Sequence, residues 1–173
     1  PVKRVLLNPT SRVQWVSSWL PQPIRWLGDN TGRFADAVRA ISQGRYSEAA
    51  SLLRPTAEHD PVAGLLLADL LVYQGDTDGA ARLLAPHAQA TDADPRVIAL
   101  LARVWIRMDR LDEAQRLLDR VIDGATRADQ LEPLLARGEL AIVQGDAPAA
   151  RDAYHRALEL HPGHAEARYG LGL

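Results

Sequence analysis

The chain has 173 residues, of which 47% are hydrophobic and 24% are charged, as is ordinary for a globular protein with a buried core. A net charge of −2 gives no general signal for a nucleic-acid partner, and the absence of cysteine excludes disulfides and thiolate metal sites. No stretch reaches the ~20 consecutive apolar residues of a membrane-spanning helix. These properties leave the localisation open between the cytoplasm and a bacterial envelope.

Residues 1–33 form a basic segment that holds three of the four tryptophans, Trp15, Trp19 and Trp26. The segment carries a net charge of +4, so the rest of the chain carries −6. A short helix ending near Leu20 is expected, because Pro21 and Pro23 follow. Three interpretations stay open: a cap over one end of the fold, a segment beside a membrane interface, or an arm that docks a partner.

From residue 34 onward the sequence repeats. A first series of small residues recurs at intervals of 31, 34, 36 and 34 positions: Ala37, Ala68, Ala102, Gly138 and Gly172. A second series of alanines recurs in step with it, at intervals of 31, 34 and 36: Ala49, Ala80, Ala114 and Ala150. Two series of small residues that recur at the same intervals indicate a repeated structural unit.

A helix breaker stands seven residues after each of the first four small residues: Gly44, Gly75, Asp109 and Gly145. Glycine takes the left-handed conformation that ends a helix, so each unit is predicted to be a helix, a tight turn and a second helix. Ser47, Asp78 and Asp112 are the expected N-caps of the second helices, and Pro148 suits a first turn. Pro55 and Pro86 predict that two of these helices are short or bent.

The units resemble tetratricopeptide repeats. The fourth unit shows this best, with Leu134, Gly138, Gly145-Asp146, Ala150, Tyr154, Ala157 and Pro162 at the family's positions. The resemblance implies an all-α, right-handed superhelix of about four helix–turn–helix repeats plus the start of a fifth. We expect an N-terminal cap or arm over residues 1–33 and a solenoid over 34–173, with repeats at about 34–61, 62–95, 96–130 and 131–164 and a partial one at 165–173.

In this family the first helix of each pair lines a concave groove. By register, the resemblance places these residues there: Val62, Leu65, Asp69, Val72, Tyr73, Arg96, Ala99, Arg103, Ile106, Arg107, Glu132, Leu135, Glu139, Ile142 and Val143. The partner-binding residues expected among them are Leu65, Asp69, Tyr73, Arg96, Arg103, Arg107, Leu135, Glu139 and Val143. Such a surface suits a helix or extended peptide with an acidic anchor facing Arg103 and Arg107. A solvated charged face without a ligand is the alternative.

Catalytic signatures do not emerge from the sequence. There is no phosphate-binding loop and no organised nucleophile and base, and His161-Pro162-Gly163-His164 matches a plain turn between repeats better than a metal site. We therefore expect a scaffold or adaptor that binds a protein or peptide, with no catalytic activity, cofactor or metal. The alternatives are the repeat portion of a larger enzyme and a membrane-tethered assembly factor. The oligomeric state stays open.

Overall fold

The computed structural model describes residues 32–124 and 126–172, and these contain nine α-helices, one short 3-10 helix and no strand. Trp15, Trp19 and Trp26 lie outside the described residues, as does nearly all of the segment 1–33. The helices are α4 (Ala35–Ser42), α5 (Tyr46–Ala57), α6 (Pro61–Tyr73), α7 (Thr77–Gln89), α8 (Pro95–Arg107), α9 (Leu111–Gly124), α10 (Leu131–Gln144), α11 (Ala147–Leu160) and α12 (Ala165–Leu171), with η2 (Arg127–Gln130) before α10.

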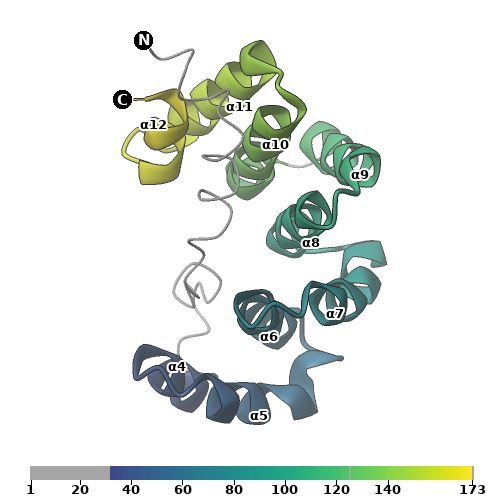
Figure 1. The fold of residues 1–173 in the computed structure, drawn as a ribbon, viewed down its shortest axis with the longest axis vertical. Coiled ribbons are helices and arrows are strands. Elements are labelled where there is room, and N and C mark those ends of the chain that lie inside the picture. The colour runs from purple at the N-terminus through teal and green to yellow at the C-terminus, as the bar shows by residue number, and fades with distance from the viewer. Residues whose placement is uncertain (1–31, 125, 173) are drawn as a thin grey trace.

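The helices stack into a crescent with two rows (Figure 1). Helices α4, α6, α8, α10 and α12 form the inner, concave row, and α5, α7, α9 and α11 form the outer row. Each of α4, α6, α8 and α10 is followed along the chain by an outer helix that packs against it. The expected all-α solenoid is confirmed.

Four turns that join an inner helix to its outer helix have the same geometry. Gly44, Gly75, Asp109 and Gly145 have φ values of 72°, 86°, 60° and 79°, as the breaker pattern predicted. In each turn the next N–H donates to the carbonyl five residues back, for example Asp76 N to Leu71 O at 2.8 Å. This is the Schellman arrangement that satisfies the last carbonyls of a helix. Asp109 is the only described residue other than glycine with a positive φ.

The N-caps of α5 and α7, which are Arg45 and Asp76, lie two positions before the predicted ones. Asp76 accepts a hydrogen bond from Gly79 N at 2.8 Å, and Asp146 accepts one from Ala149 N at 3.0 Å. The predicted caps Ser47, Asp78 and Asp112 are instead the second residues of α5, α7 and α9. A left-handed residue reverses the chain at once, so the following residue already caps the next helix. Pro148 lies in the first turn of α11, as predicted.

The prolines inside α5 and α7 shorten these helices only slightly. Pro55 and Pro86 lie in the last turns of α5 and α7, which have 12 and 13 residues, whereas α9 and α11 have 14. A proline near the end of a helix removes few backbone hydrogen bonds. The predicted shortening is therefore only one or two residues.

Small residues let the ring of Tyr154 enter the core. Tyr154 on α11 is 0% exposed. A Cβ atom added to Gly138 on α10 would lie 2.5 Å from this ring, and one added to Gly170 on α12 would lie 2.4 Å from it. Glycine is needed at both positions because no side chain fits between the ring and these two helices.

Candidate functional site

Charged side chains recur at corresponding positions on the inner helices. Asp69, Arg103 and Glu139 directly follow the small residues of α6, α8 and α10. Glu132 and Glu166 each stand six positions before the small residue of their own repeat. Because stacked repeats align equivalent positions, these side chains form rows across the concave face.

Arg103 lies at the centre of an ion-pair group that we name the Arg103 cluster, consisting of Arg103, Glu132, Glu139 and Glu166. The Arg103 Nη2 atom lies 2.9 Å from Glu139 Oε1 and 2.5 Å from Glu166 Oε1. The Arg103 Nη1 atom lies 4.0 Å from Glu132 Oε2. The Arg103 side chain is 2% exposed, and the three glutamates are 14–18% exposed. The cluster thus joins α8, α10 and α12.

The cluster contains more negative than positive charge. Burial by itself lowers the pKa of the Arg103 guanidinium, but Glu139, Glu166 and Glu132 raise it further, so the net shift is upward. Arg103 therefore stays charged while it faces three carboxylates. Three carboxylates of the chain itself thus lie around Arg103, the residue for which the sequence predicted an acidic anchor of a partner.

Arg107 lies one turn further along α8. Burial lowers the pKa of its guanidinium, whereas Glu139 and Asp69 act in the opposite direction. Arg107 thus extends the electrostatic network from the Arg103 cluster towards α6, where Asp69 is 2% exposed. Arg103 and Arg107 together interact with four carboxylates, those of Asp69, Glu132, Glu139 and Glu166, and Glu139 interacts with both arginines.

The nine predicted groove residues differ in burial. Leu65, Asp69, Arg103 and Leu135 are buried, whereas Arg96, Arg107, Glu139 and Val143 are partly buried and Tyr73 is exposed. The Arg96 guanidinium contacts Asp94, the N-cap of its own helix, at 2.5 Å. Tyr73 makes an edge-to-face contact with Tyr46, with ring centroids 4.7 Å apart. Sequence reasoning missed Glu166, although its position six residues before Gly172 matches that of Glu132.

The hydroxyl of Tyr154 is buried close to the Arg103 cluster and has no hydrogen-bond partner within the described part of the chain. Burial raises the pKa of the Tyr154 hydroxyl, and the nearby charges of Glu139 and Glu166 raise it further. An anionic phenolate is disfavoured there, so Tyr154 is a packing residue beneath an acidic surface.

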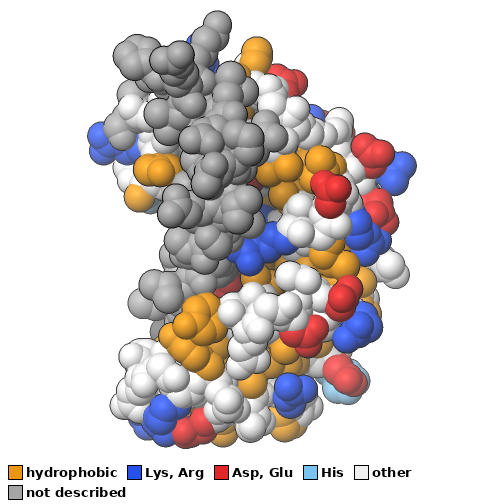
Figure 2. Space-filling view, viewed as in Figure 1, with side chains coloured by type: hydrophobic (Ala, Val, Ile, Leu, Met, Phe, Trp, Pro, Cys, Tyr) orange, Lys and Arg blue, Asp and Glu red, His pale blue; other side chains and the backbone are white. Residues whose placement is uncertain are grey.

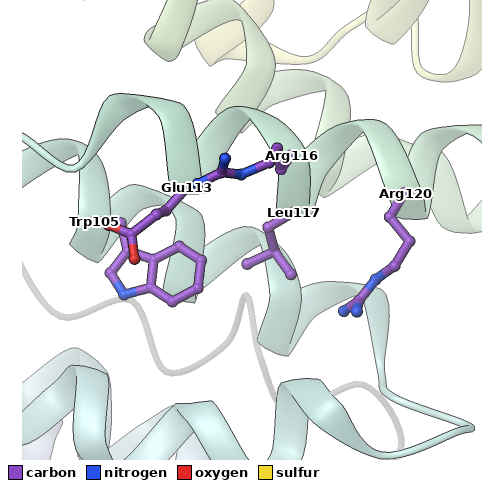
Figure 3. A pocket seen from close by; sticks show the side chains of 5 residues that line it. All are labelled: Trp105, Glu113, Arg116, Leu117 and Arg120. Atoms are coloured by element: carbon purple, nitrogen blue, oxygen red, sulfur yellow. The ribbon is translucent and has the colours of Figure 1, made fainter.

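A second concave feature is lined by side chains of α8 and α9. Figure 3 shows a hollow lined by Trp105, Glu113, Arg116, Leu117 and Arg120, into which Trp105 and Leu117 project. Arg120 donates to the carbonyl of Ala88 at 3.1 Å, which connects α9 to α7. Figure 2 shows charged side chains of both signs spread over the outer helices. The hollow is shallow and has a mixed charge.

Among residues 32–124 and 126–172, no group of three or more His, Cys, Asp or Glu side chains is placed to hold a metal ion. The rings of His161 and His164 make an edge-to-face contact with centroids 5.7 Å apart. Over the same ranges, no helix is both long and apolar enough to cross a bilayer.

The model of the tetratricopeptide repeat-like domain matches residues 32–169, which cover most of the chain and all the residues of the concave face. The chain belongs to the tetratricopeptide repeat-like family. No curated protein matches it. A tetratricopeptide repeat-like domain is a helical repeat that commonly serves as a protein-interaction module, and such domains are generally non-catalytic scaffolds.

Proposed function

We propose that this tetratricopeptide repeat-like domain is a scaffold or adaptor that binds a segment of another protein on its concave face. The observation that carries the proposal is the row of charged side chains across α6, α8, α10 and α12, at equivalent positions of successive repeats. A surface with one chemical pattern repeated along its length suits an extended or helical segment rather than a small molecule.

The charge of this face favours a basic partner segment. Within the Arg103 cluster, three carboxylates face one guanidinium. A Lys or Arg side chain of a partner adds positive charge beside these carboxylates, whereas an acidic anchor adds further negative charge. Partly buried Ile142 and Val143 and exposed Tyr73 provide apolar contacts beside the charges. The segment is therefore amphipathic and basic.

The test compares two variants that each lose two negative charges. In the concave variant, Glu139→Gln and Glu166→Gln neutralise two members of the Arg103 cluster. In the control, Asp152→Asn and Glu159→Gln neutralise two exposed side chains of outer helix α11. Each protein is used as bait in a cell lysate, and each captured protein is purified and titrated by calorimetry.

A partner that binds the unaltered chain and the control, but binds the concave variant at least about fivefold more weakly, supports the proposal. Equal affinity for both variants contradicts it. Circular dichroism shows whether the two variants keep the same helical content.

A further inference from the structure

One face of α9 carries two arginines on either side of a leucine. The residues of this face follow one another at intervals of three, one and three positions, which places them on the same side of the helix: Glu113, Arg116, Leu117 and Arg120. With Trp105 of α8 they line an open hollow of about 360 Å³. Trp105 and Arg120 lie towards its two ends, with Leu117 between them (Figure 3). The hollow thus combines apolar surface with charged groups.

Two side chains of the hollow are held in position by the rest of the fold. The Arg110 Cζ atom lies 4.9 Å from the centroid of the Trp105 ring, so a guanidinium covers one face of the indole. Arg120 donates to the carbonyl oxygen of Ala88 at 3.1 Å, which fixes its guanidinium beside α7. Side chains that are already ordered lose less conformational entropy when a ligand binds.

The charges that line the hollow are not balanced. Glu113 is the acidic member of the lining, and its carboxylate accepts a hydrogen bond of 2.6 Å from Arg110 Nε. This hydrogen bond is the main reason why the pKa of the Glu113 carboxyl is lowered. Asp78 of α7 also acts on Arg110. The two arginines of the lining, Arg116 and Arg120, form no ion pair with the described part of the chain.

The third repeat is the only one of the four described helix pairs in which a tryptophan stands beside two such arginines. The equivalent residues are Ala40, Ser51 and Pro55 in the first repeat, Leu71, Arg82 and Pro86 in the second, and Ala141, Asp152 and Arg156 in the fourth. Residues required for the stacking of repeats recur at equivalent positions, as the small residues do. The stacking of repeats therefore does not explain the hollow.

We propose that this hollow is a second docking site, which binds an acidic segment of another protein. A large apolar or aromatic side chain of the segment lies against Trp105 and Leu117. Its Asp or Glu carboxylates pair with Arg116 and Arg120, because a guanidinium matches the geometry of a carboxylate. Tryptophan and arginine are also the residues that contribute most to the affinity of protein interfaces. A volume near the lower limit of ligand pockets, about 300 Å³, suits one or two side chains of a segment.

A protein segment fits the hollow better than a nucleic acid does. Glu113 lies in the lining and repels phosphate groups, and the whole chain has a net charge of −2, whereas nucleic-acid sites usually extend over a basic surface. The hollow also uses other side chains than the Arg103 cluster, which joins α8, α10 and α12. An acidic segment in the hollow and a basic segment on the concave face thus make separate contacts.

The test uses peptides selected from a random library on the folded, full chain. Each selected peptide is titrated by calorimetry against the hollow variant, Arg116→Gln with Arg120→Gln. The control, Arg151→Gln with Arg156→Gln, removes two exposed arginines of outer helix α11. We expect a group of peptides that combine Asp or Glu with a large apolar residue, and these should bind the hollow variant at least about fivefold more weakly than the control.

The single change Arg116→Gln guards against an effect of folding. Arg116 is exposed, so its replacement should leave the thermal unfolding of the chain unchanged. It should still weaken binding of the acidic peptides about twofold. The affinity should also fall as the salt concentration rises.

Fluorine NMR locates the bound peptide. The chain has four tryptophans, so labelling with 5-fluorotryptophan gives a signal for each, and Trp105→Phe identifies the signal of Trp105. The acidic peptides should shift this signal equally in the unaltered chain and in the Glu139→Gln, Glu166→Gln variant. The same peptides with Asn and Gln in place of Asp and Glu should not shift it at the same concentration.

The inference is overturned if the selection yields no acidic peptide that shifts the Trp105 signal, or if the hollow variant and the control bind such peptides equally. A larger shift with a single-stranded DNA oligonucleotide than with the peptides overturns it in favour of a nucleic acid. Loss of peptide binding in the Glu139→Gln, Glu166→Gln variant alone places the peptide on the concave face and also overturns it. The function proposed above is tested separately, by the partner that depends on the concave face.

Discussion

Arg103 on α8 donates a hydrogen bond of 2.5 Å from Nη2 to Oε1 of Glu166 on α12, although the two residues are 63 positions apart in the chain. In a solenoid, each repeat mainly contacts its immediate neighbours. This contact instead passes across α10 and connects the third repeat to the fifth, with Glu139 of α10 bonded to the same nitrogen atom. The Arg103 cluster therefore holds together the C-terminal half of the inner row.

Replacing Arg103 by Ala should strongly destabilise the fold. The change leaves three carboxylates close together and largely buried without their shared cation, and breaking a buried ion pair in this way costs about 3–5 kcal/mol. Urea unfolding followed by circular dichroism measures the free energy of unfolding. The exposed Arg116 on α9 provides the control, because Arg116→Ala should change stability by about 0.5 kcal/mol or less. Similar losses for the two variants would contradict the structural role of Arg103.

Gly138→Ala should destabilise the protein because of Tyr154. The new Cβ would lie 2.5 Å from the Tyr154 ring, and overpacking of this kind costs about 1–3 kcal/mol. Shortening the neighbour by Tyr154→Leu should reduce the effect of the glycine substitution. A double-mutant cycle of the two changes, measured by thermal unfolding, is expected to give a coupling energy of about 1 kcal/mol or more. Additive effects would show that the ring does not set the requirement for glycine.

Asp109→Gly should stabilise the protein. Asp109 has a φ of 60°, in the left-handed region that glycine occupies at the three equivalent turns. Relief of this strain exceeds the added entropy of the unfolded chain, and we expect a gain of about 0.5–1 kcal/mol in the free energy of unfolding. The matched change in the opposite direction, Gly75→Ala, should cost about 1 kcal/mol. A loss of stability in Asp109→Gly would mean that the Asp109 side chain contributes more than its backbone strain costs.

Tyr154→Phe should leave stability near neutral pH unchanged or raise it by up to about 1 kcal/mol. The hydroxyl of Tyr154 is buried without a hydrogen-bond partner among the described residues, so its removal relieves a desolvation cost. Thermal unfolding at pH 7 measures the difference. A loss of more than about 1 kcal/mol would indicate that the hydroxyl does make a stabilising hydrogen bond.

The raised pKa of Tyr154 also predicts that the free energy of unfolding falls at alkaline pH. Burial, with Glu139 and Glu166, raises the pKa of Tyr154 in the folded chain above the value of about 10 in the unfolded chain. The contribution of the neutral Tyr154 to the free energy of unfolding is therefore complete below pH 10. It is lost as the pH rises above 10, because there only the unfolded chain releases the Tyr154 proton. Unfolding free energies at pH 8 to 11 should fall less steeply for Tyr154→Phe than for the unaltered chain. Parallel curves would contradict the upward shift.

Rules that act within a few residues allowed the sequence alone to determine the repeat and its turns. The series Gly44, Gly75, Asp109 and Gly145 predicted four left-handed turns because a positive φ is a property of the residue and its immediate neighbours. The same local reasoning erred by two positions at the N-caps, because the length of the turn decides which of Asp76 and Asp78 precedes the helix.

Only the tertiary structure decided what the charged residues do. The register predicted that Arg103 lies on the concave face. It did not predict that the Arg103 guanidinium lies among Glu132, Glu139 and Glu166, because that depends on the rotation between successive repeats. The same rotation brings Gly170 of the fifth repeat against the ring of Tyr154 of the fourth, a contact that spacing along the chain does not indicate. Spacing along the chain determined the units, and the superhelical stacking of those units determined the electrostatic character of their inner surface.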